Sequence, residues 1–204
     1  MMEKQMHQGG RKVMGIASKG YHAARALLLA VSLSGCVGGI DATGVSPISN
    51  DETFATLGYM WGGVRSAIAN KREPFDGMFT LPLSYQLPCT RGGQGAYQGT
   101  LAGTKTGGAG SAALAMTAAL SACQFDENVK ITTLSASGFT VTGTVAIAND
   151  AWGAISIRMI ATSVTVNGKV CPGGVDVMLT GTTPFVPPIS TGTACGRTGA
   201  VALP

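Results

Sequence analysis

The feature of this sequence that most restricts its fold is a two-residue alternation of apolar and hydroxyl-bearing side chains. It is clearest at residues 139–148, where one parity holds Phe139, Val141, Val145 and Ile147 and the other holds Thr140, Thr142 and Thr144. Successive side chains of a β-strand point to opposite faces, so this spacing predicts a strand with one buried face. The 30 glycines and the 12% of charged residues among 204 favour many strands joined by tight turns over a disordered chain.

The alternation continues over most of the chain that follows Pro74. It predicts strands at residues 79–87 (interrupted by Pro82), 95–105, 111–125, 129–135, 139–148, 152–166 and 169–180, with a last strand that ends near Ala202. Asn167-Gly168 is the strongest hairpin signal, because both residues tolerate the positive φ of a type I′ turn. Glycines within strands favour bulges and bends. We therefore expect a mainly β fold, with a curved antiparallel sheet or half-barrel.

One amphipathic helix is predicted before the strands, at about residues 50–69. Ser49 and Glu52 have the spacing of a capping box. The apolar residues that follow recur at intervals of three and four, as in one helical stripe: Phe54, Leu57, Trp61, Val64 and Ile68. Gly58, Gly62 and Gly63 weaken the helix by up to about 1 kcal/mol each. We therefore expect the helix to be stabilised by packing on one face of the sheet.

Residues 1–35 have the order of a secretory signal. Basic residues continue to Arg25, an apolar core covers residues 26–33, and the small residues Ser34 and Gly35 precede Cys36. This core is far shorter than the about 20 residues that a membrane-spanning helix requires. Met14 is an alternative start that would give a more compact leader.

The segment Leu33-Ser34-Gly35-Cys36 resembles the lipobox of bacterial lipoproteins. The resemblance covers only the leader and these four residues. It implies removal of residues 1–35, diacylglycerol on the Cys36 sulfur, acylation of the new amino group and a stable membrane anchor. Because Val37 rather than an aspartate follows, it implies the outer membrane in a proteobacterial host and otherwise the cell membrane. The rest of the chain is similar to uncharacterised secreted lipoproteins with Gly/Thr-rich strands, and no function comes with that similarity.

The composition after the leader changes again near Ser49. The Gly-rich segment that ends at Ile48 predicts a flexible, lipidated tether at residues 36–48. Residues 49–204 are long enough for a single β-rich domain.

Four cysteines remain after the lipobox. An exported chain meets an oxidising compartment, so we expect two disulfides. Three pairings of these cysteines exist. The predicted hairpin turn near residue 108 brings Cys89 close to Cys123, and a turn in the Pro-rich loop near residue 183 brings Cys171 towards Cys195. We therefore expect the pairs Cys89–Cys123 and Cys171–Cys195.

Several kinds of chemistry are missing from the chain that follows Cys36. Both histidines, His7 and His22, precede it, which excludes His-dependent catalytic triads and His-bearing zinc motifs in a processed single chain. We expect no metal, no other cofactor and no catalytic residues. The five basic residues and one acidic residue before Cys36 leave nine of each sign after it, so we also expect no nucleic-acid partner.

Three functions are compatible with these features. The first is a non-catalytic envelope lipoprotein, held on the membrane by its lipid, whose partner is an envelope protein or a lipid. The second is a carrier that holds an apolar ligand within the curve of the sheet, lined by Leu114, Met116, Val141 and Ile147. The third is a glycoside hydrolase that uses two of the carboxylates Asp76, Asp126, Glu127, Asp150 and Asp176. The sequence favours the first and leaves the oligomeric state open.

Overall fold

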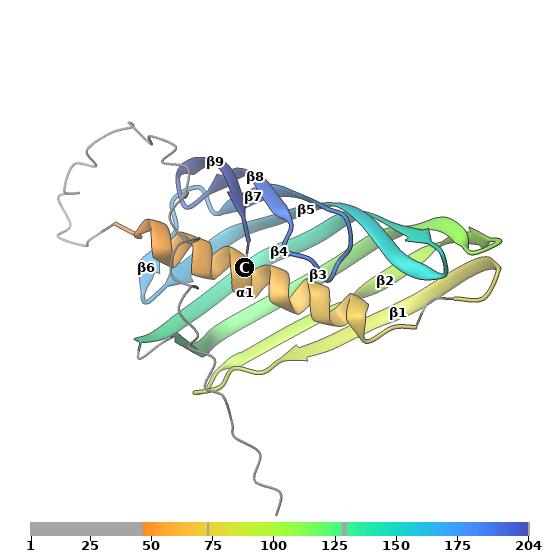
Figure 1. Cartoon of the computed structure of the whole chain (residues 1–204). Helices are drawn as coiled ribbons and strands as arrows, with labels where there is room; N and C mark the ends of the chain where they lie inside the picture. Colours follow the sequence, from red (N-terminus) through yellow and green to blue (C-terminus); the bar gives the residue numbers. More distant parts are fainter. Residues whose placement is uncertain (1–46, 73, 128–129, 204) are drawn as a thin grey trace, which may run out of the picture. The chain divides into compact units, whose positions relative to one another are not determined.

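The computed structural model describes residues 47–72, 74–127 and 130–203, in which one helix precedes nine strands (Figure 1). The elements are α1 (Asn50–Ala69), β1 (Gly77–Leu87), β2 (Gln94–Thr106), β3 (Ala109–Glu127), β4 (Lys130–Ala148), β5 (Ala151–Val166), β6 (Lys169–Val170), β7 (Val175–Gly181), β8 (Ile189–Ala194) and β9 (Arg197–Ala202). They form one antiparallel sheet in the order β1-β2-β3-β4-β5-β7-β8-β9, with β6 paired to β5. The sheet is open and α1 packs against it, so the expected mainly β fold is confirmed.

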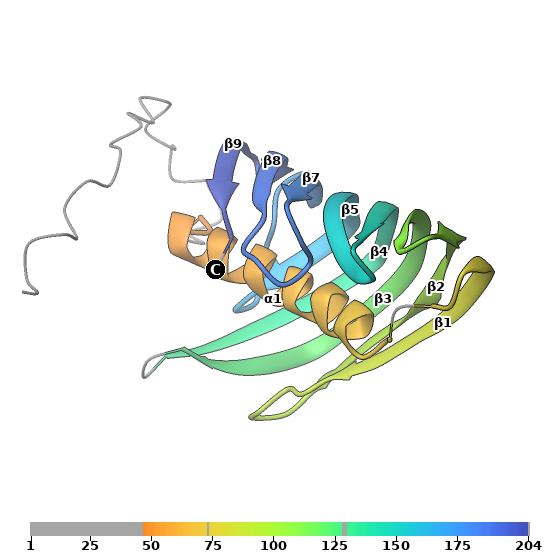
Figure 2. The same cartoon turned by 45° about the vertical axis from the view of Figure 1, so that its right-hand side comes forward.

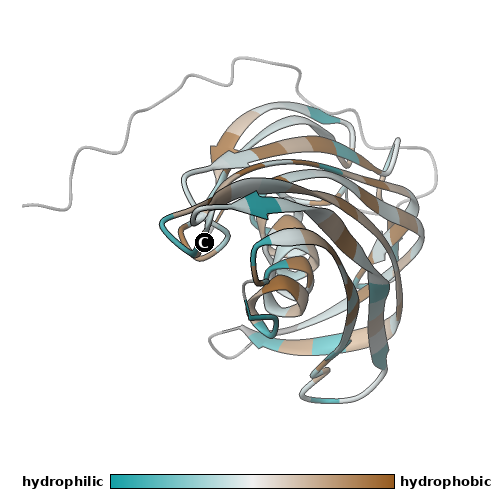
Figure 3. Cartoon of the chain, turned by 90° about the vertical axis from the view of Figure 1, so that its right-hand side faces the viewer, coloured by the Kyte–Doolittle hydropathy of each residue, from teal (hydrophilic) through white to brown (hydrophobic). Residues whose placement is uncertain are grey.

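The sheet curves around α1, which lies on its inner face (Figures 2 and 3). One row of paired positions crosses this face from β2 to β7: Leu101, Leu114, Gly143, Ile157 and Leu179. The four large side chains of the row are at most 2% exposed. They belong to the same core as the helix residues Met60, Trp61 and Ile68. Burial on the sheet therefore supplies the stability that the glycine-containing helix lacks on its own.

The predicted helix is confirmed, but the prediction was wrong for one residue of its apolar stripe. Leu57, Trp61, Val64 and Ile68 are buried, whereas the side chain of Phe54 is 39% exposed. The buried side of α1 extends from this stripe towards smaller residues: Thr53, Thr56, Gly63 and Ala67. The sheet lies close to α1 at Gly63, where a Cβ atom would collide with the ring of Tyr97, and Phe54 stays partly exposed.

The predicted strands are present, with three differences. The expected break near Gly138 is absent, because Gly138 adopts a φ of 58° inside a continuous β4. The expected strand at 169–180 is divided into β6 and β7 by a turn in which the N–H of Gly174 donates to the carbonyl of Cys171. The expected last strand is a hairpin of β8 and β9, which turns at Cys195 and Gly196 with positive φ at both.

Pro82 does not interrupt its strand. It is paired with Thr100 in the middle of β1, and β1 is an edge strand of the sheet. A proline is compatible with an edge strand because its missing N–H can face solvent instead of a neighbour. At the same position it removes a donor from the free edge, which hinders uncontrolled pairing with other strands.

Candidate functional site at the start of the folded domain

The folded domain begins at Ile48, within the segment predicted as tether. Its side chain is 4% exposed and belongs to the core. Its carbonyl oxygen accepts a hydrogen bond of 2.8 Å from Nη2 of Arg197, at the start of β9. Pro47 is exposed, and residues 36–46 of the expected tether, including Cys36, lie outside the described residues. The chain therefore enters the domain next to an edge strand, and it is fixed there by both burial and a hydrogen bond.

The next residues form the expected capping box. Oγ of Ser49 accepts a hydrogen bond of 3.1 Å from the N–H of Glu52, and Oε2 of Glu52 accepts one of 2.8 Å from the N–H of Ser49. This arrangement satisfies N–H groups that have no partner within the helix. The carbonyl of Ser49 also accepts from both the N–H and the hydroxyl of Thr53. The first turn of α1 is therefore tightly held.

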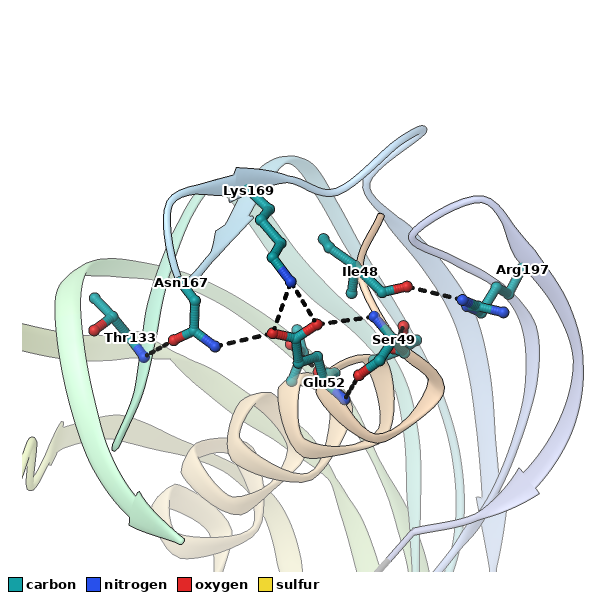
Figure 4. Close-up of polar contacts among 9 residues, drawn as sticks. Ile48, Ser49, Glu52, Thr133, Asn167, Lys169 and Arg197 are labelled. Carbon is teal, nitrogen blue, oxygen red and sulfur yellow. Dashed lines mark hydrogen bonds and ion pairs between the residues drawn. The ribbon is translucent and has the colours of Figure 1, made fainter. Parts of the chain in front are cut away.

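Glu52 extends the cap to the sheet (Figure 4). Its Oε1 accepts a hydrogen bond of 3.1 Å from Nδ2 of Asn167, and both carboxylate oxygens lie 3.2–3.3 Å from Nζ of Lys169. Oδ1 of Asn167 in turn accepts a bond of 2.9 Å from the N–H of Thr133 in β4. A single carboxylate thus joins the start of α1 to the β5–β6 hairpin and, through Asn167, to β4.

The electrostatics of this cluster keep Glu52 ionised. The side chain of Glu52 is 7% exposed, and such burial by itself raises the pKa of its carboxyl group. The hydrogen bonds from Ser49, Asn167 and Lys169, together with the charge of Lys169, outweigh burial and lower the pKa from 4.5 to about 2. A buried carboxylate is stable only with such partners. The cluster is therefore a fixed ion pair with its hydrogen bonds made, suited to holding elements together.

The sequence revealed only part of this site. The Ser49–Glu52 spacing and the Asn167-Gly168 turn were recognised, and the φ values of 53° and 77° at the turn agree with type I′. The contacts of Glu52 with Asn167 and Lys169 span 115 and 117 residues, so no local pattern could indicate them. Arg197 lies 149 residues from Ile48 and was missed for the same reason.

Both expected disulfides are present. Cys89 is bonded to Cys123 with a Cα–Cα distance of 5.0 Å, and Cys171 is bonded to Cys195 with one of 4.3 Å. The first joins the segment between β1 and β2 to β3, and the second joins the β6–β7 turn to the β8–β9 turn. Disulfides form and persist in oxidising compartments, so the pair indicates such an environment for this domain.

The four residues proposed to line an apolar cavity lie on the inner face of the sheet. Leu114, Met116, Val141 and Ile147 are at most 4% exposed and share one core with α1. Two open hollows, of about 440 and 520 Å³, lie instead along the beginning of β1, around Met78 and Phe79. A ligand on the inner face would therefore require α1 to move.

The acidic residues proposed for catalysis are distributed around the sheet. Four of them each contact a different partner: Asp76 accepts from the N–H of Gly107, Asp126 pairs with Arg91, Asp150 with Lys105 and Asp176 with Arg158. The side chain of Glu127 lies outside the described residues. The hydrogen bonds from Arg158 lower the pKa of Asp176, which favours its charged form at neutral pH. Among the described residues, no group of three or more His, Cys, Asp or Glu side chains is placed to hold a metal ion.

Comparison with known proteins adds no assignment: no family model, curated protein or solved structure matches the chain. Within the described part of the chain, no helix combines the length and the apolar character needed to cross a membrane.

Proposed function

We propose that this protein is exported, lipidated on Cys36 and anchored to the bacterial envelope, where it has a structural or interaction role without catalysis. In a proteobacterial host the anchor lies in the outer membrane, and elsewhere in the cell membrane. The observation that carries the proposal is the position of Leu33-Ser34-Gly35-Cys36 at the end of a short apolar core that follows a basic segment.

The two disulfides support export, because they agree with an oxidising compartment. The cluster around Glu52 supports a role as an attachment point. A lipid on Cys36 is connected to the domain through residues 37–48, and a fully extended chain of that length reaches about 40 Å. Any pull along this segment arrives at Ile48 and Ser49, which contact β9 and α1 directly. From there Glu52 transmits it to the β5–β6 hairpin.

The test is intact-mass spectrometry of the full-length gene product after detergent extraction of membranes, with and without reductant. We expect a chain that starts at Cys36 and carries acyl groups, with a mass that rises by about 4 Da on reduction of two disulfides. A Cys36→Ala variant is the matched control, because it removes the acyl acceptor and leaves the four cysteines of the domain intact. An unlipidated wild-type chain, or one that retains residues 1–35, would refute the anchor.

A further inference from the structure

One side of α1 faces away from the core. With 3.6 residues per turn, Asp51, Phe54, Gly58, Gly62 and Arg65 fall within one stripe about 80° wide. Each is exposed or half-buried, in contrast to the opposite side of the helix, which packs on the sheet. In Figure 1, α1 lies in front of the strands β1 to β5. The stripe is thus a helix surface available to a partner.

Gly62 has no packing role within the domain. A Cβ atom built on Gly62 would meet no atom within 4 Å, whereas one on the neighbouring Gly63 would lie 2.1 Å from the ring of Tyr97. The close approach of Tyr97 explains why residue 63 is a glycine. It does not explain Gly62, which weakens the helix relative to alanine and gains no internal contact in return.

The charges on the stripe also lack partners in the part of the domain that the structure describes. Among the described residues, the carboxylate of Asp51 and the guanidinium of Arg65 make no hydrogen bond or ion pair. The other charged side chain of α1, Glu52, is fully engaged at the Lys169 cluster. The stripe therefore carries one unpaired charge of each sign.

These features are symmetric about Gly58. Asp51 and Arg65 lie seven residues on either side of it, about 10 Å along the helix axis. Phe54 and Gly62 lie four residues on either side, about 6 Å along the axis. When two copies of such a helix pack antiparallel about a two-fold axis, each residue meets the one at the same distance on the other side of the centre.

We propose that two copies of this chain associate through α1, antiparallel, with Gly58 at the two-fold axis. Phe54 of each copy then lies over Gly62 of the other, where the missing side chain leaves space for the ring. Arg65 of each copy pairs with Asp51 of the other. The small residue at the centre permits the helix axes to approach closely. This association does not depend on the lipid anchor.

Sedimentation velocity over a range of concentrations tests the proposal. It uses the full chain with Cys36→Ser, which removes the free thiol and the acyl acceptor. We expect a concentration-dependent dimer. Asp51→Arg or Arg65→Asp alone replaces two attractive pairs by two repulsive ones, and we expect each to raise the dimer dissociation constant at least about tenfold. The double variant Asp51→Arg/Arg65→Asp restores the pairs in reversed order and should recover the dimer, whereas Arg72→Asp, an equal charge change outside the stripe, should leave it unchanged.

A cysteine at the centre gives a second, independent measurement. In the Cys36→Ser chain, Gly58→Cys supplies one free thiol at the two-fold axis, and mild oxidation should link two copies. Ala69→Cys is the control, because it is exposed on the same side but about 16 Å from the centre along the axis, so its symmetry mate is out of reach. A chain that is monomeric at every concentration, a double variant that does not recover the dimer, or equal cross-linking of both cysteines would overturn the proposal.

Discussion

Two adjacent glycines of α1 are predicted to respond in opposite ways to the same substitution. Alanine at Gly62 places its methyl group in open space, with no atom within 4 Å. Alanine at Gly63 places it 2.1–2.6 Å from three atoms of the Tyr97 ring and hydroxyl. The two substitutions are matched, because they lie at adjacent positions of the same helix and make the same chemical change.

The magnitudes follow from the two environments. Each substitution gains about 0.8–1 kcal/mol of helix propensity, so Gly62→Ala should raise the free energy of unfolding by about that amount. At Gly63 the gain is opposed by overpacking, which typically costs about 1–3 kcal/mol. Tyr97 is fully buried, and moving its ring also breaks the 3.2 Å bond from its hydroxyl to the carbonyl of Met60. Leaving that hydroxyl unpaired costs about 1–3 kcal/mol more. We expect a net loss of about 2 kcal/mol for Gly63→Ala.

Urea unfolding followed by circular dichroism, with disulfides intact, measures both effects. It is done at two protein concentrations below the dimer dissociation constant, where equal midpoints show that association does not contribute. The expected separation between the variants is about 3 kcal/mol. If both variants are stabilised, Tyr97 moves without penalty and the explanation of Gly63 by close packing is refuted. If both are destabilised alike, the open space at Gly62 is refuted.

Three further predictions concern the cluster around Glu52 and one disulfide. Folding lowers the pKa of Glu52 from 4.5 to about 2, so its stabilising contribution is complete above about pH 5 and is lost as the pH falls towards 2. Between pH 5 and pH 2, the free energy of unfolding measured with urea should fall by up to about 3 kcal/mol more in wild type than in Glu52→Gln. Equal decreases would contradict the proposed interactions of Glu52. Lys169→Met removes a hydrogen-bond donor from the buried carboxylate of Glu52 and should lower the free energy of unfolding, measured with urea at neutral pH, by about 2 kcal/mol. Arg158→Met removes one partner of an exposed ion pair and should have little effect. Replacing Cys171 and Cys195 together by alanine removes a link across 24 residues and should lower the free energy of unfolding by about 3–4 kcal/mol. The urea midpoint should fall accordingly, and an unchanged midpoint would count against that disulfide.

Much of the fold was predictable because its information is local. The alternation at residues 139–148 predicted the second half of β4, and the Asn167-Gly168 pair predicted the β5–β6 turn. Consecutive strands of the sheet are mostly neighbours, so correct turns also gave the correct strand order. The two disulfides followed from that order, because each joins segments that a turn brings together.

The rest depends on contacts between distant segments. Nothing near Phe54 indicates that the sheet approaches α1 from the side of Gly63, since that depends on Tyr97 in β2. The same applies to Glu52: its capping role was predictable from the Ser49–Glu52 spacing, whereas its contacts with Lys169 and Asn167 were not. The predicted interruption at Pro82 was wrong for a similar reason, because only the strand order shows that β1 is an edge strand.

The placement of α1 has a consequence for the order in which the molecule acquires its structure. The helix is synthesised before every strand described here, yet Glu52 binds Asn167 and Lys169, which lie 115 and 117 residues later. Ile48, just before the helix, binds Arg197, 149 residues later. The sheet, by contrast, mostly pairs strands that are neighbours in the chain. Short isolated helices are marginal in water, and the glycines of α1 weaken this one further. We therefore expect the start of α1 to be secured only after the β5–β6 hairpin and β9 have formed, although its middle already meets Tyr97 in β2.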